Sequence, residues 1–149
     1  MSRLTTSSIV IDAPLEAVYR VIVDVGSYPE WISQLKSAEV LQSDEQGRPS
    51  QVRFSIDAGM FSDDLVVAYT WSDTGAQWQL VSGTKVREQT GGYRLAADGT
   101  GTSVEYDLRL DVDMPMFSLF RGQAERMLTD AALTSLKQRV ESPNGGTAH

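Results

Sequence analysis

The sequence predicts an α+β fold in which a curved antiparallel sheet wraps around one long C-terminal helix. Residues 115–141 are the only stretch long enough to cross a small domain. At about 1.5 Å per residue they would form a helix of roughly 40 Å. Seven short runs with β-type alternation precede this stretch, and tight turns join successive runs after the first. Such a succession is typical of an antiparallel meander with one dry face and one wet face.

The composition is that of one globular domain. The chain has 149 residues, is 41% hydrophobic and carries a formal net charge of -7. We expect a single domain over residues 1–141 and a loose tail over residues 142–149, which lack an apolar anchor. The acidic balance disfavours nucleic acid and anionic membranes as partners. No signal-peptide core and no apolar run of membrane-spanning length is found, so a cytoplasmic protein without membrane insertion is expected.

The first elements are a strand over residues 5–11 and a helix that follows it. Asp12 stands where a helix N-cap belongs, with Pro14 and Glu16 in the first turn, where both are favoured. Apolar residues at helical spacing continue to a predicted end near Gly26.

A second short helical piece is predicted over residues 28–32, which contain two aromatic residues and a proline. Trp31 in this piece has two interpretations. It is either part of a well-packed structural turn or part of a cavity rim.

The β pattern extends from Leu35 to Asp113. The runs cover residues 38–42, 52–58, 65–71, 78–80, 89–95 and 104–113. Gly91 and Gly92 interrupt the sixth of the seven runs, and a glycine pair inside a strand predicts a bulge or a strong bend. The last run is the clearest, because every second residue from Val104 to Val112 is apolar or aromatic.

The long helix has one apolar face and one charged face. Spacings of three and four residues place these side chains on the predicted inner face: Phe117, Phe120, Ala124, Met127, Leu128 and Ala131, followed by Ala132, Leu136 and Val140. Glu125, Arg126, Lys137 and Arg139 are predicted to face solvent.

The order of a strand, two short helices, six strands and a long helix resembles the START-like, or SRPBCC, superfamily. Within it, the chain is most similar to the polyketide cyclase/dehydrase and lipid-transport group found in actinobacteria. The resemblance rests on Ile11-Asp12-Ala13-Pro14 with Val18, Tyr28-Pro29-Glu30-Trp31, Val52-Arg53-Phe54, Asp57-Ala58-Gly59, Tyr69-Thr70-Trp71, Met114-Pro115 and Lys137-Gln138-Arg139-Val140-Glu141. It implies a helix-grip fold with a hydrophobic cavity between the sheet and the long helix, but no single activity.

The residues exclude several chemistries. His149 is the only histidine and there is no cysteine, so no metal site of the His or Cys type, no catalytic triad and no cofactor are expected. No phosphate-binding glycine motif lies between a strand and a helix. The carboxylates at Asp63-Asp64, at Asp44-Glu45 and at Asp107, Asp111 and Asp113 are interpreted as solvated charges.

The predicted dry face is the best candidate for a site, because it is uncharged and yet carries tyrosine, tryptophan and glutamine side chains. A ligand pocket is mostly apolar with a few placed polar groups, whereas a packed core avoids many polar tips. The candidate ligand-binding residues are Phe54, Ile56, Val67, Tyr69, Trp71, Trp78, Leu80, Gln89, Tyr93, Tyr106, Leu108, Phe120, Ala124, Met127, Leu128 and Ala131. Trp31, Met60 and Phe61 are candidates for the cavity mouth. In the alternative interpretation, the tyrosines reach the sheet rim and their hydroxyls meet water.

Three functions remain open at this stage. The first is binding or transport of a small neutral hydrophobic ligand, such as a lipid, an isoprenoid quinone or a polyketide-like molecule. The second is a polyketide cyclase, aromatase or dehydratase, with Tyr69, Tyr93 or Tyr106 as acid or base and Arg121 as an anion holder. Such a role needs the tyrosine pKa of about 10 to be lowered. The third is a module that acts through protein contacts, and assembly as a homodimer also stays open.

Overall fold

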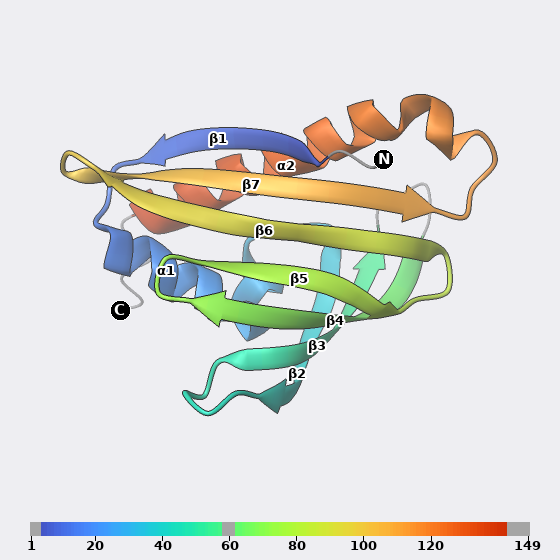
Figure 1. Ribbon diagram of the computed structural model, residues 1–149, viewed down its shortest axis with the longest axis horizontal. Helices are drawn as coiled ribbons and strands as arrows, with labels where there is room; N and C mark the ends of the chain where they lie inside the picture. The colour runs from blue at the N-terminus through green and yellow to red at the C-terminus, as the bar shows by residue number, and fades with distance from the viewer. Residues whose placement is uncertain (1–3, 58–61, 143–149) are drawn as a thin grey trace.

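The computed structural model describes residues 4–57 and 62–142 and has the architecture that the sequence predicts (Figure 1). Seven antiparallel strands form one curved sheet in the order β1-β7-β6-β5-β4-β3-β2. Two short helices follow the first strand, and one long helix ends the described chain. The elements are β1 (Thr5–Ile11), α1 (Leu15–Val23), η1 (Val25–Glu30), β2 (Leu35–Ser43), β3 (Pro49–Asp57), β4 (Ser62–Ser72), β5 (Gly75–Ser82), β6 (Val86–Asp98), β7 (Gly101–Val112) and α2 (Phe117–Glu141). The α+β prediction is therefore confirmed.

The first helix begins later than predicted. Pro14, with an extended backbone, occupies the N-cap position of α1 and no side chain caps the helix. Asp12 is not the cap, because the backbone turns immediately after β1, where the N–H of Ala13 donates to the carbonyl of Ile11. The helix also ends early, at Val23, and the chain continues as the 3-10 turn η1. The two short helices predicted after the first strand are thus α1 and η1.

The predicted bulge at Gly91 and Gly92 is wrong. Both residues pair regularly with β7, Gly91 with Leu108 and Gly92 with Asp107. A Cβ atom on Gly91 would lie 2.4 Å from the carbonyl oxygen of Asp107 and 2.9 Å from Cζ2 of Trp78. Glycine is needed here because a neighbouring backbone and an indole ring approach closely, not because the strand is interrupted.

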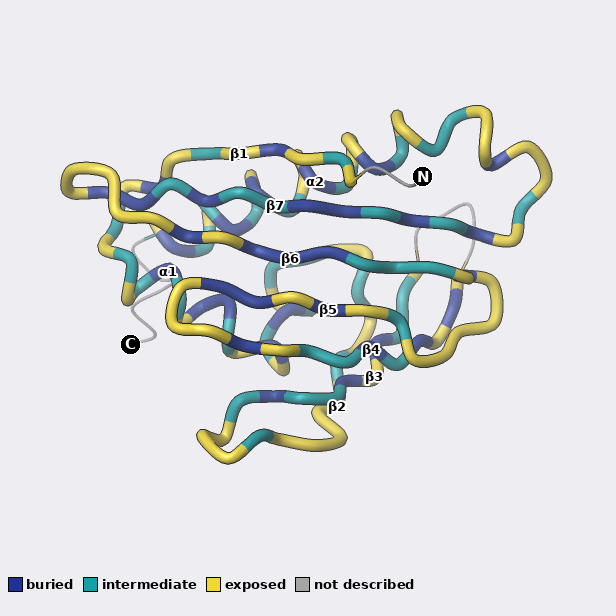
Figure 2. Tube along the Cα trace, in the orientation of Figure 1, coloured by how far each residue is buried: buried dark blue, intermediate teal, exposed yellow. Residues whose placement is uncertain are grey.

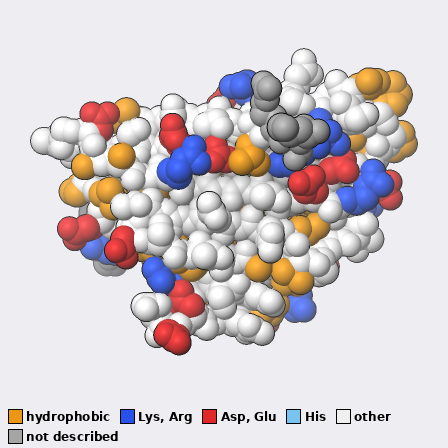
Figure 3. Space-filling view, in the orientation of Figure 1, with side chains coloured by type: hydrophobic (Ala, Val, Ile, Leu, Met, Phe, Trp, Pro, Cys, Tyr) orange, Lys and Arg blue, Asp and Glu red, His pale blue; other side chains and the backbone are white. Residues whose placement is uncertain are grey.

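The buried residues concentrate in the middle of the long strands, while the turns at both ends of the sheet are exposed (Figure 2). Figure 3 shows the outer face of the sheet, which turns away from α2. Charged side chains lie there in pairs, such as Arg94 with Glu105 and Asp107. The wet outer face agrees with the alternation in the sequence.

The long helix packs mainly against β1 and β7 and also contacts α1. Its orientation about its own axis differs from the prediction. Met127 is 69% exposed and Ala131 is exposed, whereas Glu125 is only 2% exposed and Thr129 is fully buried. Met127 and Ala131 therefore do not belong to the inner face, and Glu125 is not solvated.

Hydroxyl groups on β1 explain this orientation. The hydroxyl of Thr5 donates to Oε1 of Glu125 at 2.7 Å, and the hydroxyls of Ser7 and Thr129 are 2.8 Å apart. The backbone N–H of Leu110 donates to Oε2 of Glu125 at 2.7 Å. Polar helix residues can face the sheet because the strands offer them hydrogen-bond partners, which hydrophobic periodicity does not reveal.

Candidate functional site

The inner face of the sheet carries a continuous aromatic cluster. Tyr69 and Trp71 come from β4, Trp78 from β5, Tyr93 from β6 and Tyr106 from β7. Neighbouring ring centroids are 5.3 Å apart for Tyr69 and Trp71, 5.7 Å for Tyr69 and Trp78, 5.4 Å for Trp78 and Tyr106, and 4.8 Å for Tyr93 and Tyr106. The cluster spans four adjacent strands.

Strand register brings these rings together. Tyr69 is the cross-strand partner of Trp78, and Tyr93 is the partner of Tyr106. Trp78 also pairs with Gly91, which has no side chain to displace the indole. Because side chains of a strand alternate between its faces, all five rings lie on the side of α2.

The tyrosines differ in whether their hydroxyls are satisfied. Tyr19 donates to the carbonyl of Ser72 at 2.7 Å, and Tyr28 donates to the carbonyl of Ile22 at 2.5 Å. Among the described residues, the hydroxyls of Tyr69, Tyr93 and Tyr106 have no hydrogen-bond partner. None of these three oxygen atoms is among the fully buried, unpaired atoms. Tyr69 and Tyr106 also remain partly exposed in the middle of the sheet. Three phenol groups on the inner face therefore lack a hydrogen-bond partner among the described residues.

Burial raises the pKa of all three tyrosines above the ordinary phenol value. The neighbouring tyrosines add to this rise for Tyr69 and Tyr93, because a second phenolate nearby would repel the first. The shift is opposite to the one that base catalysis requires. These groups stay protonated at neutral pH and are available as hydrogen-bond donors.

Gln89 adds a second polar group to the inner face. Its Oε1 atom is buried and has no hydrogen-bond partner. Its Nε2 atom is not fully buried, and it also has no hydrogen-bond partner among the described residues. Gln89 pairs with Leu110 of β7, close to the beginning of α2. An unsatisfied amide at this place is unusual for a packed core, in which buried polar groups are normally paired.

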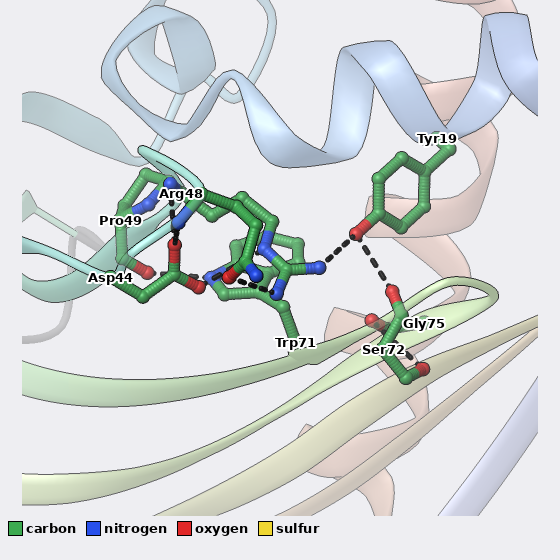
Figure 4. Close-up of polar contacts among 8 residues, drawn as sticks. Tyr19, Asp44, Arg48, Pro49, Trp71, Ser72 and Gly75 are labelled. Atoms are coloured by element: carbon green, nitrogen blue, oxygen red, sulfur yellow. Dashed lines mark hydrogen bonds and ion pairs between the residues drawn. The ribbon is translucent and has the colours of Figure 1, made fainter.

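One end of the inner face is tied by a polar network (Figure 4). Arg48, in the turn between β2 and β3, forms an ion pair with Asp44 at 3.0 Å and donates to the hydroxyl of Tyr19 at 3.3 Å. Tyr19 in turn reaches Ser72 at the end of β4. The indole of Trp71 donates to the carbonyl of Pro49 at 2.6 Å. These contacts link α1 with two strand turns.

At the other end of the sheet, Asp63 holds the turn between β5 and β6. Its carboxylate accepts hydrogen bonds from the backbone N–H groups of Thr84, Lys85 and Val86 at 2.8–3.1 Å. Burial alone would raise the pKa of Asp63, but these bonds outweigh it and lower the pKa. The interpretation of Asp63 as a solvated charge is therefore wrong. Asp107 is also buried, between Arg94 and Thr6.

The predicted ligand-binding residues fall into three groups. Buried members of the inner face are Phe54, Val67, Trp71, Trp78, Tyr93 and Leu108. Partly exposed members are Ile56, Tyr69, Leu80, Gln89, Tyr106, Phe120, Ala124 and Leu128. Met127 and Ala131 lie outside. The second group is informative, because partial exposure along the inner face marks where another molecule can make contact.

Two side chains near the beginning of α2 have structural roles that the sequence did not indicate. Arg121 donates to the carbonyl of Leu110 at 3.0 Å and forms an ion pair with Asp111 at 2.9 Å. Its guanidinium group is thereby engaged by protein partners, and its role as an anion holder stays a prediction. Together with Glu125, it satisfies both backbone groups of Leu110, which lies just beyond the pairing of Leu108 with Thr5, the first residue of β1.

The predicted cavity mouth is described only in part. Trp31 is partly exposed and packs edge-on against Tyr28, with ring centroids 5.2 Å apart. This contact fits the structural interpretation, while its exposure leaves the rim interpretation open. Met60 and Phe61 lie outside the described residues.

The outer face also has a shallow hollow, between Thr70, Gln77, Thr90 and Arg94. Its lining mixes polar and apolar residues, and the charge of Arg94 is balanced by Glu105 and Asp107. It offers neither a large apolar area nor a free charge. The inner face is therefore the better candidate site.

Residues 4–57 and 62–142 contain no group of three or more histidine, cysteine, aspartate or glutamate side chains placed to hold a metal ion. Within the same ranges, no helix is long and apolar enough to cross a membrane.

A curved sheet that grips a C-terminal helix, with an aromatic inner face, defines a START-like protein of the helix-grip type. The chain belongs to the family described as polyketide cyclase / dehydrase and lipid transport, whose model matches residues 11–137. The actinobacterial subgroup stays a prediction. No curated protein matches the sequence.

Solved structures with the same fold cover nearly the whole chain. A START superfamily protein from Mycobacterium smegmatis has a TM-score of 0.86 at 20% identity and covers 94% of this chain and 98% of its own. A protein from Thermus thermophilus has a TM-score of 0.77 at 20% identity, with 93% and 97% covered. The Zhui aromatase/cyclase from Streptomyces sp. R1128 has a TM-score of 0.73 at 14% identity, with 96% and 98% covered. At these identities the likeness establishes the fold alone.

Proposed function

We propose that the protein binds a small, uncharged hydrophobic molecule between the inner face of the sheet and α2. The observation that carries this proposal is the aromatic cluster, whose central tyrosines keep both accessible surface and unpaired hydroxyls. Ligand sites combine apolar walls with a few placed polar groups, and this face has that composition. The family, which includes lipid transport, supports the same function.

The charges of the chain agree with a neutral ligand. Near the inner face, Asp63, Arg121 and Glu125 are each engaged by backbone or side-chain partners. A bound anion or cation would therefore lose its hydration without gaining a counter-charge, which is costly. The formal net charge of -7 also disfavours nucleic acid as a partner. We place this binding in the cytoplasm.

A cyclase or aromatase is the second candidate, favoured by the three phenols that meet at one place. Their raised pKa values allow them to donate hydrogen bonds or a proton to a substrate carbonyl, but not to abstract a proton at neutral pH. A cyclisation would therefore need its base from the substrate or from water. Conversion of a co-purified ligand, followed by mass spectrometry, would distinguish this activity from simple binding.

The binding proposal is tested by filling the space with a side chain. Ala124 is partly buried on α2 and packs against the core, while Ala131 on the same helix is exposed. We expect Ala124→Phe to abolish binding of the neutral dye Nile red while stability stays within about 1 kcal/mol of wild type, because the ring would occupy the proposed ligand space. In a close-packed interface the added ring would cost roughly 1–3 kcal/mol.

Ala131→Phe is the matched control, because it adds the same ring to the same helix on the outside. It should change neither dye binding nor the free energy of unfolding measured in urea. Strong destabilisation by Ala124→Phe without any change in dye binding would contradict the proposed site.

A further inference from the structure

The polar groups of the inner face are arranged at two separate places. Tyr69, Tyr93 and Tyr106 form one place, because their rings are in contact with one another or with Trp78. The amide of Gln89 is the other place. None of these groups has a hydrogen-bond partner among the residues that the structure describes. Each phenol and the amide Nε2 can donate a hydrogen bond.

Strand β6 connects the two places, because it carries both Gln89 and Tyr93 of the tyrosine group. Gln89, Gly91 and Tyr93 alternate onto the same face of this strand, and Gln89 and Tyr93 are four residues apart. A strand rises about 3.3 Å per residue, which separates their Cα atoms by roughly 13 Å. Trp78 lies against Gly91 between them. The floor between the two donor groups is therefore a flat indole.

The surroundings contain no free cation, among the residues described, that would favour an acidic ligand. Arg121, the nearest basic side chain on α2, is held by Asp111 and by the carbonyl of Leu110. Glu125 is held by Thr5 and by the backbone of Leu110. The donors that remain are neutral, and neutral donors are best matched by neutral acceptors such as carbonyl oxygens.

We propose that the inner face selects elongated, planar and uncharged molecules that carry a carbonyl oxygen at each end, with Gln89 recognising one carbonyl and the tyrosine group recognising the other. Trp78 supports the flat middle of the ligand. This specificity rests on the proposed binding function and adds to it a class of ligand and a residue, Gln89, that discriminates within that class. Hydrocarbon chains and fatty acids would bind less well, because they leave the donors unpaired or bring an uncompensated charge.

Three probes of one shape test the proposal. An isopropenyl group has the shape of an acetyl group but carries CH₂ in place of oxygen. Affinities of 2,6-diisopropenylnaphthalene, 2-acetyl-6-isopropenylnaphthalene and 2,6-diacetylnaphthalene would be measured by displacement of Nile red. For the wild type we expect each added carbonyl to increase affinity by about 3- to 10-fold, the effect of one hydrogen bond between neutral groups.

Two variants test which residues cause the two increases in affinity. Gln89→Leu should remove one of them, and the double variant Tyr69→Phe with Tyr106→Phe should remove or weaken the other, while affinity for the diisopropenyl probe is retained. Gln77→Leu is the control, because Gln77 is exposed on the outer face of β5, and it should retain both steps. If Gln89→Leu does not fold, Gln89→Met removes the same amide with an unbranched side chain.

The outcomes separate the two proposals. If Nile red binds and all three probes displace it equally, the carbonyl specificity is wrong while the binding function stands. If both steps persist in Gln89→Leu, the role of Gln89 is wrong. If neither the dye nor any probe binds to the wild type, the binding function fails and the specificity fails with it.

Discussion

Glu125 shows how one residue can decide the orientation of a helix. Its two carboxylate oxygens accept hydrogen bonds from the Thr5 hydroxyl and from the backbone N–H of Leu110. Both donors lie in the sheet, and the side chain is almost fully buried. A buried carboxylate is tolerated when its oxygens are hydrogen-bonded, so Glu125 fixes which side of α2 faces β1.

Replacement of Glu125 should separate hydrogen bonding from charge. Glu125→Ala leaves the N–H of Leu110 buried and unpaired, which we expect to cost about 1–3 kcal/mol of stability. Glu125→Gln keeps an acceptor for Leu110, and its amide can donate to the Thr5 hydroxyl, so it should cost less than Glu125→Ala. Urea unfolding of the three proteins checks this order. Equal losses in both variants would show that the charge, and not the hydrogen bonds, matters.

Two glycines should respond in opposite directions to the same substitution. Gly91→Ala places a Cβ atom against the carbonyl of Asp107 and the ring of Trp78, and we expect a loss of about 1–3 kcal/mol. Gly122 lies inside α2, and a Cβ atom on it would meet nothing within 4 Å. Gly122→Ala should therefore stabilise the protein by about 0.5–1 kcal/mol, because alanine favours the helix. Thermal unfolding of both variants measures the two signs, and stabilisation by Gly91→Ala would contradict the close approach of Trp78.

At the scale of elements, Asp63 joins the beginning of β4 to the turn before β6. The folded state lowers the pKa of this carboxyl, since three backbone N–H groups donate to its charged form. A lowered pKa contributes stability above the ordinary carboxyl pKa of about 4. This contribution is lost as the pH falls through the pKa of the folded state.

The pH dependence of unfolding tests this link. Asp63→Asn should be less stable at pH 7 by roughly 1–3 kcal/mol, because the amide accepts fewer and weaker hydrogen bonds. Below about pH 4 the difference between the two proteins should shrink, because the wild-type carboxyl also loses its charge. A constant difference from pH 7 to pH 3 would mean that the carboxylate does not carry the effect.

The elements show what local sequence can predict. The strands were recognisable because alternation is a property of neighbouring residues, as in β7. The side of α2 that faces the sheet could not be recognised from local sequence, because it depends on a contact between Ser7 and Thr129. These residues are 122 positions apart in the chain. Hydrophobic spacing placed Met127 inward and Glu125 outward, since no local signal shows that β1 presents hydroxyls.

The candidate site was predictable to a similar extent. The inner-face tyrosines and Gln89 follow from strand alternation. The state of their polar groups does not, because it depends on tertiary contacts. Tyr19 has a backbone partner, whereas the hydroxyls of Tyr69 and Tyr106 have none among the described residues. The direction of the tyrosine pKa shifts also follows from burial in the folded protein.

For the whole molecule, a bound ligand should contribute to stability. A ligand that binds only the folded state at about 100 times its Kd adds about 2.7 kcal/mol. For a chain of this size such a gain raises Tm by roughly 5–10 °C. Protein freed of co-purified small molecules by unfolding and refolding should therefore melt earlier than protein as isolated, and return of the extract should restore Tm. An unchanged Tm after verified ligand removal would contradict binding inside the fold.

The place of β1 in the sheet has a consequence for how the chain is made. Strands β2 to β7 each pair with a strand adjacent in sequence, but β1 pairs with β7. Its hydrogen bonds to α2 join residues 120 and 122 positions apart. On the ribosome, β1 emerges before the other six described strands but can pair only after β7 has been made, and the five-strand meander from β2 to β6 can assemble before it. Such long-range closure slows folding. The nascent chain must therefore keep β1 from pairing elsewhere until β7 has been synthesised.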